Sequence, residues 1–233
     1  PPGRRDFVIS DDFRLPLAVD VLAVYPHAHY LGKLLDAYAT LPDGSRQWLI
    51  RIPDWNLNWQ AIYRYRKPVF LPKDSVVSMR YHYDNSAANP RNPNRPPKRV
   101  RAGNEATDEM GHLWLQLLPR AAGDHRRELA EAWMRHRVEK YPDDFSSNLQ
   151  LGALALSRLD AAGAASALAV AVRVKPGDAI AHNLYGSALQ TLGRSPEALE
   201  QFQIAVRLKG DFVNARYNLA RGLIKAGRMD EAI

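Results

Sequence analysis

The sequence contains no cysteine. That absence excludes disulfide bonds, thiolate zinc sites and cysteine nucleophiles. The chain also lacks a long apolar run: no stretch approaches the roughly 18 residues that a bilayer span requires, so we expect no membrane span. Residues 1–6 lack the apolar core of a signal peptide, and the chain does not begin with methionine. We therefore expect it to be part of a longer protein.

The composition is that of folded protein. Of 233 residues, 46% are hydrophobic and 24% charged, which suits two modest domains. The net charge is +7, and one segment between residues 84 and 105 has cations but no acids. No nucleic-acid-binding module surrounds this segment, so we expect a solvated loop and no nucleic-acid partner. Its cations are Arg91, Arg95, Lys98, Arg99 and Arg101.

Residues 1–120 have the short alternating apolar runs of an antiparallel β domain. A Pro-Asp-Gly-Ser turn at 42–45 predicts a hairpin over 34–52. Residues 1–17 are polar and are expected to form an irregular lead-in. The pattern predicts a β-sandwich. Its strands are expected at 18–25, with continuation through residue 29, and at 34–41, 47–52, 61–71, 75–83 and from 110 onward.

After residue 120 the pattern changes to alanine, leucine and helical spacing. Small or turn-forming residues recur every 34 residues, the period of tetratricopeptide (TPR) repeats. They are Gly152, Gly186 and Ala220; Ala164, Ala198 and Ala232; and Pro142, Pro176 and Gly210.

We predict repeats at 145–178, 179–212 and 213–233, the last stopping midway, after a connecting or capping helix within 121–144. Such an α-helical solenoid binds protein or peptide partners on a concave surface. Five polar residues are candidates to line that surface, although each also suits an ordinary solvated helix position: His182, Asn183, Arg216, Asn218 and Lys225.

Two histidines stand two positions apart at the end of the first predicted strand. His27 and His29 would project from the same face if the strand continues through Pro26, and both could then reach one metal ion. The alternative is a structural or surface pair. A third ligand is offered by Met110, whose soft thioether, together with imidazole, suits copper, above all Cu(I). The alternative for Met110 is an ordinary core position.

Several motifs in the first half occur in a family-specific order. They resemble the C-terminal catalytic domain of the copper type II, ascorbate-dependent monooxygenases, the family of peptidylglycine α-hydroxylating monooxygenase and dopamine β-hydroxylase, and most of all its bacterial members. The resemblance covers about residues 15 to 119. The motifs are H-A-H-Y-L-G-K at 27–33, W-L-I at 48–50, Y-D-N-S at 83–86, N-P at 89–90 and 92–93, and D-E-M at 108–110.

The resemblance implies a jelly-roll-like β-sandwich in which His27, His29 and Met110 hold a catalytic copper. The implied activity is hydroxylation of a C–H bond in an organic substrate, with O2 and a reductant such as ascorbate, in a periplasmic or extracellular setting. The family holds a second copper on histidines of a preceding domain, and the other histidines here form no second H-x-H. We therefore expect this chain to bind copper without completing coupled hydroxylation by itself.

The substrate cannot be inferred from the motifs. In peptide-amidating members an Arg precedes the first histidine by two positions, and an Asn and a Tyr follow the Met by two and four. Here those positions are Tyr25, His112 and Trp114, which argues against glycine-extended peptides. His112 and His82 are candidates for the surroundings of the metal or the substrate pocket, or else are hydrogen-bonded core histidines.

Three functional hypotheses follow. The first is a copper monooxygenase domain fused to a TPR interaction array. The second is a TPR-based binding scaffold whose β domain is structural or binds copper without catalysis. The third is a copper store or sensor, which a single three-ligand site suits poorly.

Overall fold

The computed structural model describes residues 1–103, 105 and 107–231. The chain divides into two compact units, Pro1–Leu129 and Ala130–Ile233, and each is described by itself. The predicted equivalence of Ala232 with Ala164 and Ala198, and the predicted end of the third repeat, fall on 232–233, outside the described residues. None of the helices in the described part combines the length and apolar composition that a membrane crossing requires.

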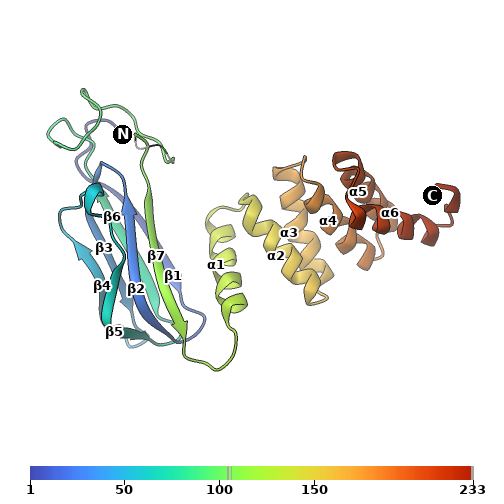
Figure 1. Cartoon of the computed structure of the whole chain (residues 1–233), viewed down its shortest axis with the longest axis horizontal. Coiled ribbons are helices and arrows are strands. Elements are labelled where there is room, and N and C mark those ends of the chain that lie inside the picture. Colours follow the sequence, from blue (N-terminus) through green and yellow to red (C-terminus); the bar gives the residue numbers. More distant parts are fainter. Residues whose placement is uncertain (104, 106, 232–233) are drawn as a thin grey trace. The chain divides into compact units, whose positions relative to one another are not determined.

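The first unit is a two-sheet β domain, as the sequence predicts. Its sheets have the strand orders β1-β6-β3-β4 and β5-β2-β7, and neighbouring strands pair antiparallel. Figure 1 shows the two layers. The jelly-roll connectivity stays a prediction. In the described residues the elements are β1 Phe7–Arg14, β2 Val19–Ala28, β3 Gly32–Thr40, β4 Arg46–Ile52, η1 Leu57–Trp59, β5 Tyr63–Leu71, β6 Val76–Tyr83 and β7 Gly111–Pro119.

The predicted irregular lead-in over 1–17 is wrong, because β1 pairs with β6 along its whole length. Adjacent acids at 11 and 12 obscure the alternation in the sequence. In the structure Ile9 and Phe13 pack against the core, while Asp12 lies on the opposite side and forms an ion pair with Arg80 at 2.8 Å. The hairpin β3–β4 is confirmed, with Gly44 at φ +83° in its turn.

The two sheets share one core, which leaves the other face of β5-β2-β7 for polar and aromatic side chains. Val19 and Val21 of β2 are fully buried and lie in one cluster with Ala37 and Ala39 of β3. On β7, Leu113, Leu115 and Leu117 pack inward, so the residues between them face outward. Tyr25 and His27 of β2 and His112 and Trp114 of β7, which are considered below, lie on this outward face.

The second unit is a helical array. The first two predicted repeats each contain a pair of helices, and the described part of the third contains one helix and a short 3-10 turn. Asp144, Asp160 and Asp178 cap the helices that follow them by accepting backbone N–H bonds. Helix α1 crosses the division between the units at Leu129 and Ala130. The helices of the described residues are α1 Arg126–Lys140, α2 Phe145–Ser157, α3 Ala161–Val174, α4 Ala179–Thr191, α5 Ser195–Leu208, α6 Val213–Lys225 and the short η2 Met229–Glu231.

The first helices of the repeats lie in one layer. α2 contacts α4 and α4 contacts α6, in addition to the contacts between helices that are consecutive in the chain. The second helices, α3 and α5, approach each other less closely. In a curved array the more closely spaced layer lies on the concave side, so α2, α4 and α6 form the concave layer.

Glycines permit this close packing. A Cβ placed on Gly152 would lie 2.4 Å from Leu168, and one on Gly186 would lie 2.6 Å from Phe202. These contacts join the two helices within each repeat. The recurring small residues that reveal the period in the sequence are therefore packing residues.

Candidate functional site

His27 and His29 lie together at the end of β2. Their ring centroids are 5.0 Å apart and the rings are nearly perpendicular, at 87°. Two imidazoles that each bind one ion through a nitrogen at about 2 Å have a comparable separation. His29 is 6% exposed, and His27 is half-buried.

Each of these rings has one nitrogen engaged. His27 Nδ1 lies 2.6 Å from Gln60 Oε1, and His29 Nδ1 lies 3.0 Å from the carbonyl oxygen of Asp108. Because a carbonyl oxygen only accepts, both Nδ1 atoms donate, and a neutral ring then carries its lone pair on Nε2. Within the described residues neither Nε2 has a hydrogen-bond partner. Such outer hydrogen bonds are characteristic of histidines that hold metals.

Glu109 connects the segment before β7 to the end of β2. Its carboxylate accepts hydrogen bonds from the backbone N–H groups of His29, Leu31 and Met110, the last two at 2.9 and 3.0 Å. Burial raises the pKa of Glu109 above its usual range, and the three N–H bonds oppose that rise. The glutamate of the D-E-M motif thus has a structural role, because it holds the backbones of His29, Leu31 and Met110.

The backbone of Met110 is fixed beside His29. The same oxygen, Oε1 of Glu109, accepts from the N–H groups of both residues, and the carbonyl of Met110 accepts from the Tyr83 hydroxyl at 2.6 Å. The Tyr81 hydroxyl donates to the carbonyl of His112 at 3.0 Å. Two buried tyrosines of β6 therefore hold the start of β7 in place.

The donor set suits a soft metal better than a hard one. Among the described residues no group of three or more His, Cys, Asp or Glu side chains is arranged to hold a metal ion. A site here therefore depends on the thioether of Met110 together with the two imidazoles. Thioether and imidazole ligands favour copper over calcium or magnesium. The two available Nε2 atoms suit a soft metal, and Met110, whose backbone is held beside His29, is the candidate third ligand.

Other residues of the sequence motifs, among them Gly32 and Lys33, have structural roles. A Cβ on Gly32 would lie 2.7 Å from the Trp55 ring, and Trp55 donates its Nε1–H to the carbonyl of Ala28 at 3.1 Å. Lys33 and Arg91 both bind Asp54, each at 2.9 Å, and together they lower the pKa of that carboxyl. The L-G-K motif at 31–33 and the loop with the N-P motifs at 89–93 thus stabilise the region around the histidines.

An aromatic row continues from the histidines along the outward face. The register places His27 opposite His112 and Tyr25 opposite Trp114. Tyr25 and Trp114 are stacked with centroids 5.2 Å apart, and His27 and His112 are 6.2 Å apart. Trp114 is 51% exposed, so this row offers a flat apolar surface beside the imidazoles. The structure thus brings together Tyr25, His112 and Trp114 with the histidine pair.

His82 lies elsewhere. Its neighbours Tyr81 and Tyr83 point into the core, so alternation along β6 directs His82 to the opposite face of the other sheet. There its Nδ1 lies 2.7 Å from Asp6. The expected place of His82 in the surroundings of the metal is therefore corrected.

Sequence reasoning missed three residues that position the site. Gln60 contacts His27 from the segment after η1, Glu109 binds three backbone amides, and Tyr83 binds the backbone of Met110. The signal for Glu109 is its place in the D-E-M motif, directly before the candidate ligand Met110. Gln60 has no signal in the sequence.

The concave layer of the array holds a second candidate site. Asn218 Nδ2 donates to Asn183 Oδ1 at 2.9 Å, and Arg221 Nη2 donates to Gln190 Oε1 at 3.0 Å, so two polar contacts link α6 to α4. Asn183 is only 6% exposed but lines the pocket described below, whereas His182, which is equally buried, does not line that pocket although we expected it to line this surface. Its ring instead contacts Gln201 of α5 at 2.7 Å, so that expectation is wrong.

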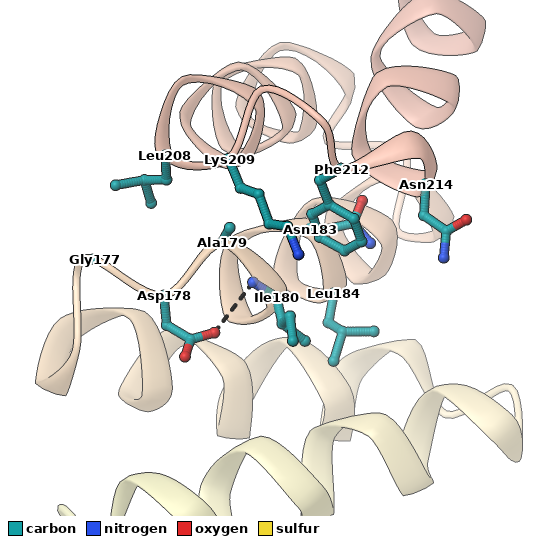
Figure 2. A pocket seen from close by; sticks show the side chains of 10 residues that line it. All are labelled: Gly177, Asp178, Ala179, Ile180, Asn183, Leu184, Leu208, Lys209, Phe212 and Asn214. Carbon is teal, nitrogen blue, oxygen red and sulfur yellow. Dashed lines mark hydrogen bonds between the residues drawn. The ribbon is translucent and has the colours of Figure 1, made fainter.

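A pocket of about 580 Å³ opens at one end of this layer. Figure 2 shows the start of α4, the end of α5 and the start of α6 around it. Its polar side chains are Asp178, Asn183, Lys209 and Asn214, and its apolar wall includes Ile180 and Phe212. We call the pocket, together with the neighbouring polar residues of α4 and α6, the array groove. Those polar residues are Asn183, Gln190, Asn218 and Arg221.

The family comparison decides the nature of the helical part. Residues 149–211 and 186–233 match the tetratricopeptide repeat family. The C-terminal part of the chain is a TPR array. The prediction of TPR repeats in this part of the chain is thereby confirmed.

Curated relatives share part of this array. The peroxisomal targeting signal receptors of Saccharomyces cerevisiae and Candida albicans are each 42% identical over 62 residues, which is 27% of this chain. The chain spans about a tenth of the length of these receptors, 10% in both cases.

Solved structures of MamA are also similar. A crystal structure of MamA is 22% identical, with a TM-score of 0.45, and the match covers 49% of this chain and 70% of that one. MamA from Desulfovibrio magneticus is 21% identical, with a TM-score of 0.42, covering 46% of this chain and 59% of that one.

Proposed function

We propose that the chain is a protein-binding scaffold whose TPR array holds a segment of a partner protein in the array groove. The observation that carries this proposal is the polar ladder of Asn183, Asn218, Gln190 and Arg221 on the concave layer beside an open pocket. Side-chain amides pair with peptide N–H and C=O groups, which suits an extended segment. The similarity to proteins named as targeting-signal receptors supports peptide recognition by the same repeats.

The proposal is tested by selecting a random peptide display library on the full chain. We expect enriched peptides whose binding is lost in Asn183→Ala/Gln190→Ala. The matched control is Gln203→Ala on α5, in the other layer, which should retain binding. Enriched peptides that bind both variants equally would show that the groove is not the binding surface.

We also propose that the β unit binds one copper ion through His27, His29 and Met110. This second candidate rests on the two Nε2 lone pairs, which the bonds to Gln60 and Asp108 leave available. Copper supplies the one-electron chemistry that O2 activation requires. With O2, ascorbate or another reductant, and an unknown organic substrate, the corresponding activity is that of a monooxygenase.

In this proposal, residues of the chain position the candidate ligands and shield the site from water. Glu109 fixes the backbones of His29 and Met110, and the Gln60 amide sets the orientation of His27. The stacked Tyr25 and Trp114 provide an apolar surface on which a substrate can lie beside the imidazoles. Binding, orientation and exclusion of water are thus the contributions of the protein.

Competition with a chromophoric Cu(I) chelator under anaerobic conditions tests this second proposal without relying on activity. We expect His27→Ala to weaken Cu(I) binding at least about 10-fold, because one of three ligands is lost. His82→Ala is the matched control on the opposite sheet and should bind as the wild type does. Equal effects of both substitutions would exclude His27 as a ligand.

A further inference from the structure

The helices of the concave layer carry no carboxylate. α2 and α4 contain neither Asp nor Glu, and α6 contains cations but no acid. In the described residues from 145 onward, every carboxylate lies in a helix cap, in a loop, on α5 or in η2. Among the residues that line the pocket, the cap residue Asp178 is the one carboxylate, and it lies 3.4 Å from Lys175. With Lys209, Arg221 and Lys225, the array groove therefore carries more positive than negative charge.

A stripe of α6 faces α4 along this surface. Asn214, Asn218, Arg221 and Lys225 follow one another at intervals of four, three and four residues, which places them on one face of the helix. Asn214 lines the pocket, while Asn218 and Arg221 bind α4 directly. Lys225 continues the stripe and is exposed.

Lys209 lacks the acidic neighbour that the equivalent lysine of the preceding repeat contacts. In the first repeat Lys175 Nζ lies 3.4 Å from Asp178. One repeat later the equivalent residues are Lys209 and Phe212, and Lys209 Nζ lies 5.9 Å from the Phe212 ring. Figure 2 shows Lys209 directed over the pocket.

The groove cations have no acidic partner in the described part of the chain. Arg221 binds an uncharged amide and contacts the Tyr217 ring, and neither Lys209 nor Lys225 forms an ion pair there. By contrast, Arg194 on the loop before α5 pairs with Glu197. Cations that form no ion pair along a polar groove attract negative charge from a partner.

We infer that the array groove binds an acidic, extended segment of a partner protein. Its carboxylates pair with Lys209, Arg221 and Lys225, and its backbone contacts the amides of Asn183 and Asn214. Adjacent helices are about 10 Å apart and an extended chain rises about 3.3 Å per residue, so the layer accommodates roughly six to nine residues. This inference rests on the proposed function of the array.

The test uses the peptides enriched from the random display library on the full chain. We expect them to contain more Asp and Glu than the input library and to bind more weakly as salt is raised. Replacing their acids with the matching amides should weaken binding at least about 10-fold, since two or three exposed ion pairs are lost. Retained binding after that replacement overturns the inference.

Charge-matched variants locate the effect. Arg221→Gln/Lys225→Gln should weaken binding of an enriched acidic peptide about 10-fold. Arg207→Gln/Arg173→Gln removes the same charge from α5 and α3 and should stay within about twofold. Equal loss in both double variants would mean that net charge alone attracts the peptide, which overturns the groove assignment.

The outcomes also separate this inference from the proposed function. Enriched peptides without acids, whose binding depends on Asn183, would overturn the acidic segment and leave the scaffold proposal standing. A selection that enriches nothing would overturn both.

Discussion

The two units of this chain bring their candidate site residues together in different ways. In the β unit the bond between His29 and Glu109 joins positions 80 residues apart, whereas in the array the bond between Asn218 and Asn183 spans 35 residues, about one repeat. The β site depends on the register of distant strands. The array groove depends on one repeat packed beside the next repeat. A local defect should therefore affect the two units differently.

The largest effect is expected from Glu109→Ala. Three backbone N–H groups lose their acceptor, and each buried donor left unpaired costs about 1–3 kcal/mol. We expect the free energy of unfolding of the β unit to fall by about 3 kcal/mol, with little change in the array. Hydrogen exchange followed by mass spectrometry resolves the two units. Glu105→Ala, at an exposed acid of the same loop, is the control, and an equal effect there would contradict the role of Glu109.

The converse test is Gly186→Val in the array. The added side chain would meet Phe202 and the carbonyl of Ala198, where even a Cβ would be 2.6 and 3.1 Å away. Overpacking of this kind costs about 1–3 kcal/mol, so the helical signal should melt earlier by several degrees while the β unit is unchanged. Gly210→Ala has no atom within 4 Å of the new Cβ and should be neutral. A stable Gly186 variant would show that the helices can separate without cost.

Acid should destabilise the array through Asp144. This carboxylate caps α2 through the Ser147 N–H and pairs with Arg137 at 2.8 Å, and that pair lowers its pKa to about 2. Because the pKa is depressed in the folded state, the stabilisation is complete above the unfolded pKa of about 4 and is lost as the pH falls toward 2.

Asp144→Asn should therefore cost about 1–2 kcal/mol at pH 7 and progressively less as the pH falls through about 2. Urea denaturation monitored by helical circular dichroism across this range measures the difference. A cost that does not change with pH would assign the effect to lost packing.

The smallest effect is expected from Tyr83→Phe. The hydroxyl donates to the carbonyl of Met110, and loss of one such bond costs about 1 kcal/mol. Tyr65→Phe is a matched control, because its hydroxyl binds the carbonyl of Leu49 in another part of the unit. Both variants should lose similar stability, but only Tyr83→Phe should weaken Cu(I) binding. Equal copper affinity in the two variants would separate Tyr83 from the metal site.

The same difference between the units determines how far the sequence predicts them. The array is evident from its period because Gly152 and Gly186 perform the same packing in successive repeats. The strands and the β3–β4 hairpin follow from alternation and turn residues. β1 was missed because Asp11, on the same face of the strand as Ile9 and Phe13, interrupts the alternation of apolar and polar residues.

The details of the candidate sites required the structure. The closeness of His27 and His29 follows from strand geometry. The hydrogen bond between His27 and Gln60, which lies in the connection between β4 and β5, leaves no pattern in the sequence. His182 was misassigned because a polar residue on a helix can equally face a neighbouring helix, here through Gln201. Pairing between distant segments is set by three-dimensional register, which a single sequence does not specify.

The most direct test of the β site is X-ray absorption at the copper edge after anaerobic titration of the chain with Cu(I), for the wild type and Met110→Ala. The account predicts one equivalent of copper bound by two nitrogens and one sulfur, with the sulfur signal lost in the variant. Binding that is weak, or that is the same without Met110, would contradict a site assembled from the ends of β2 and β7.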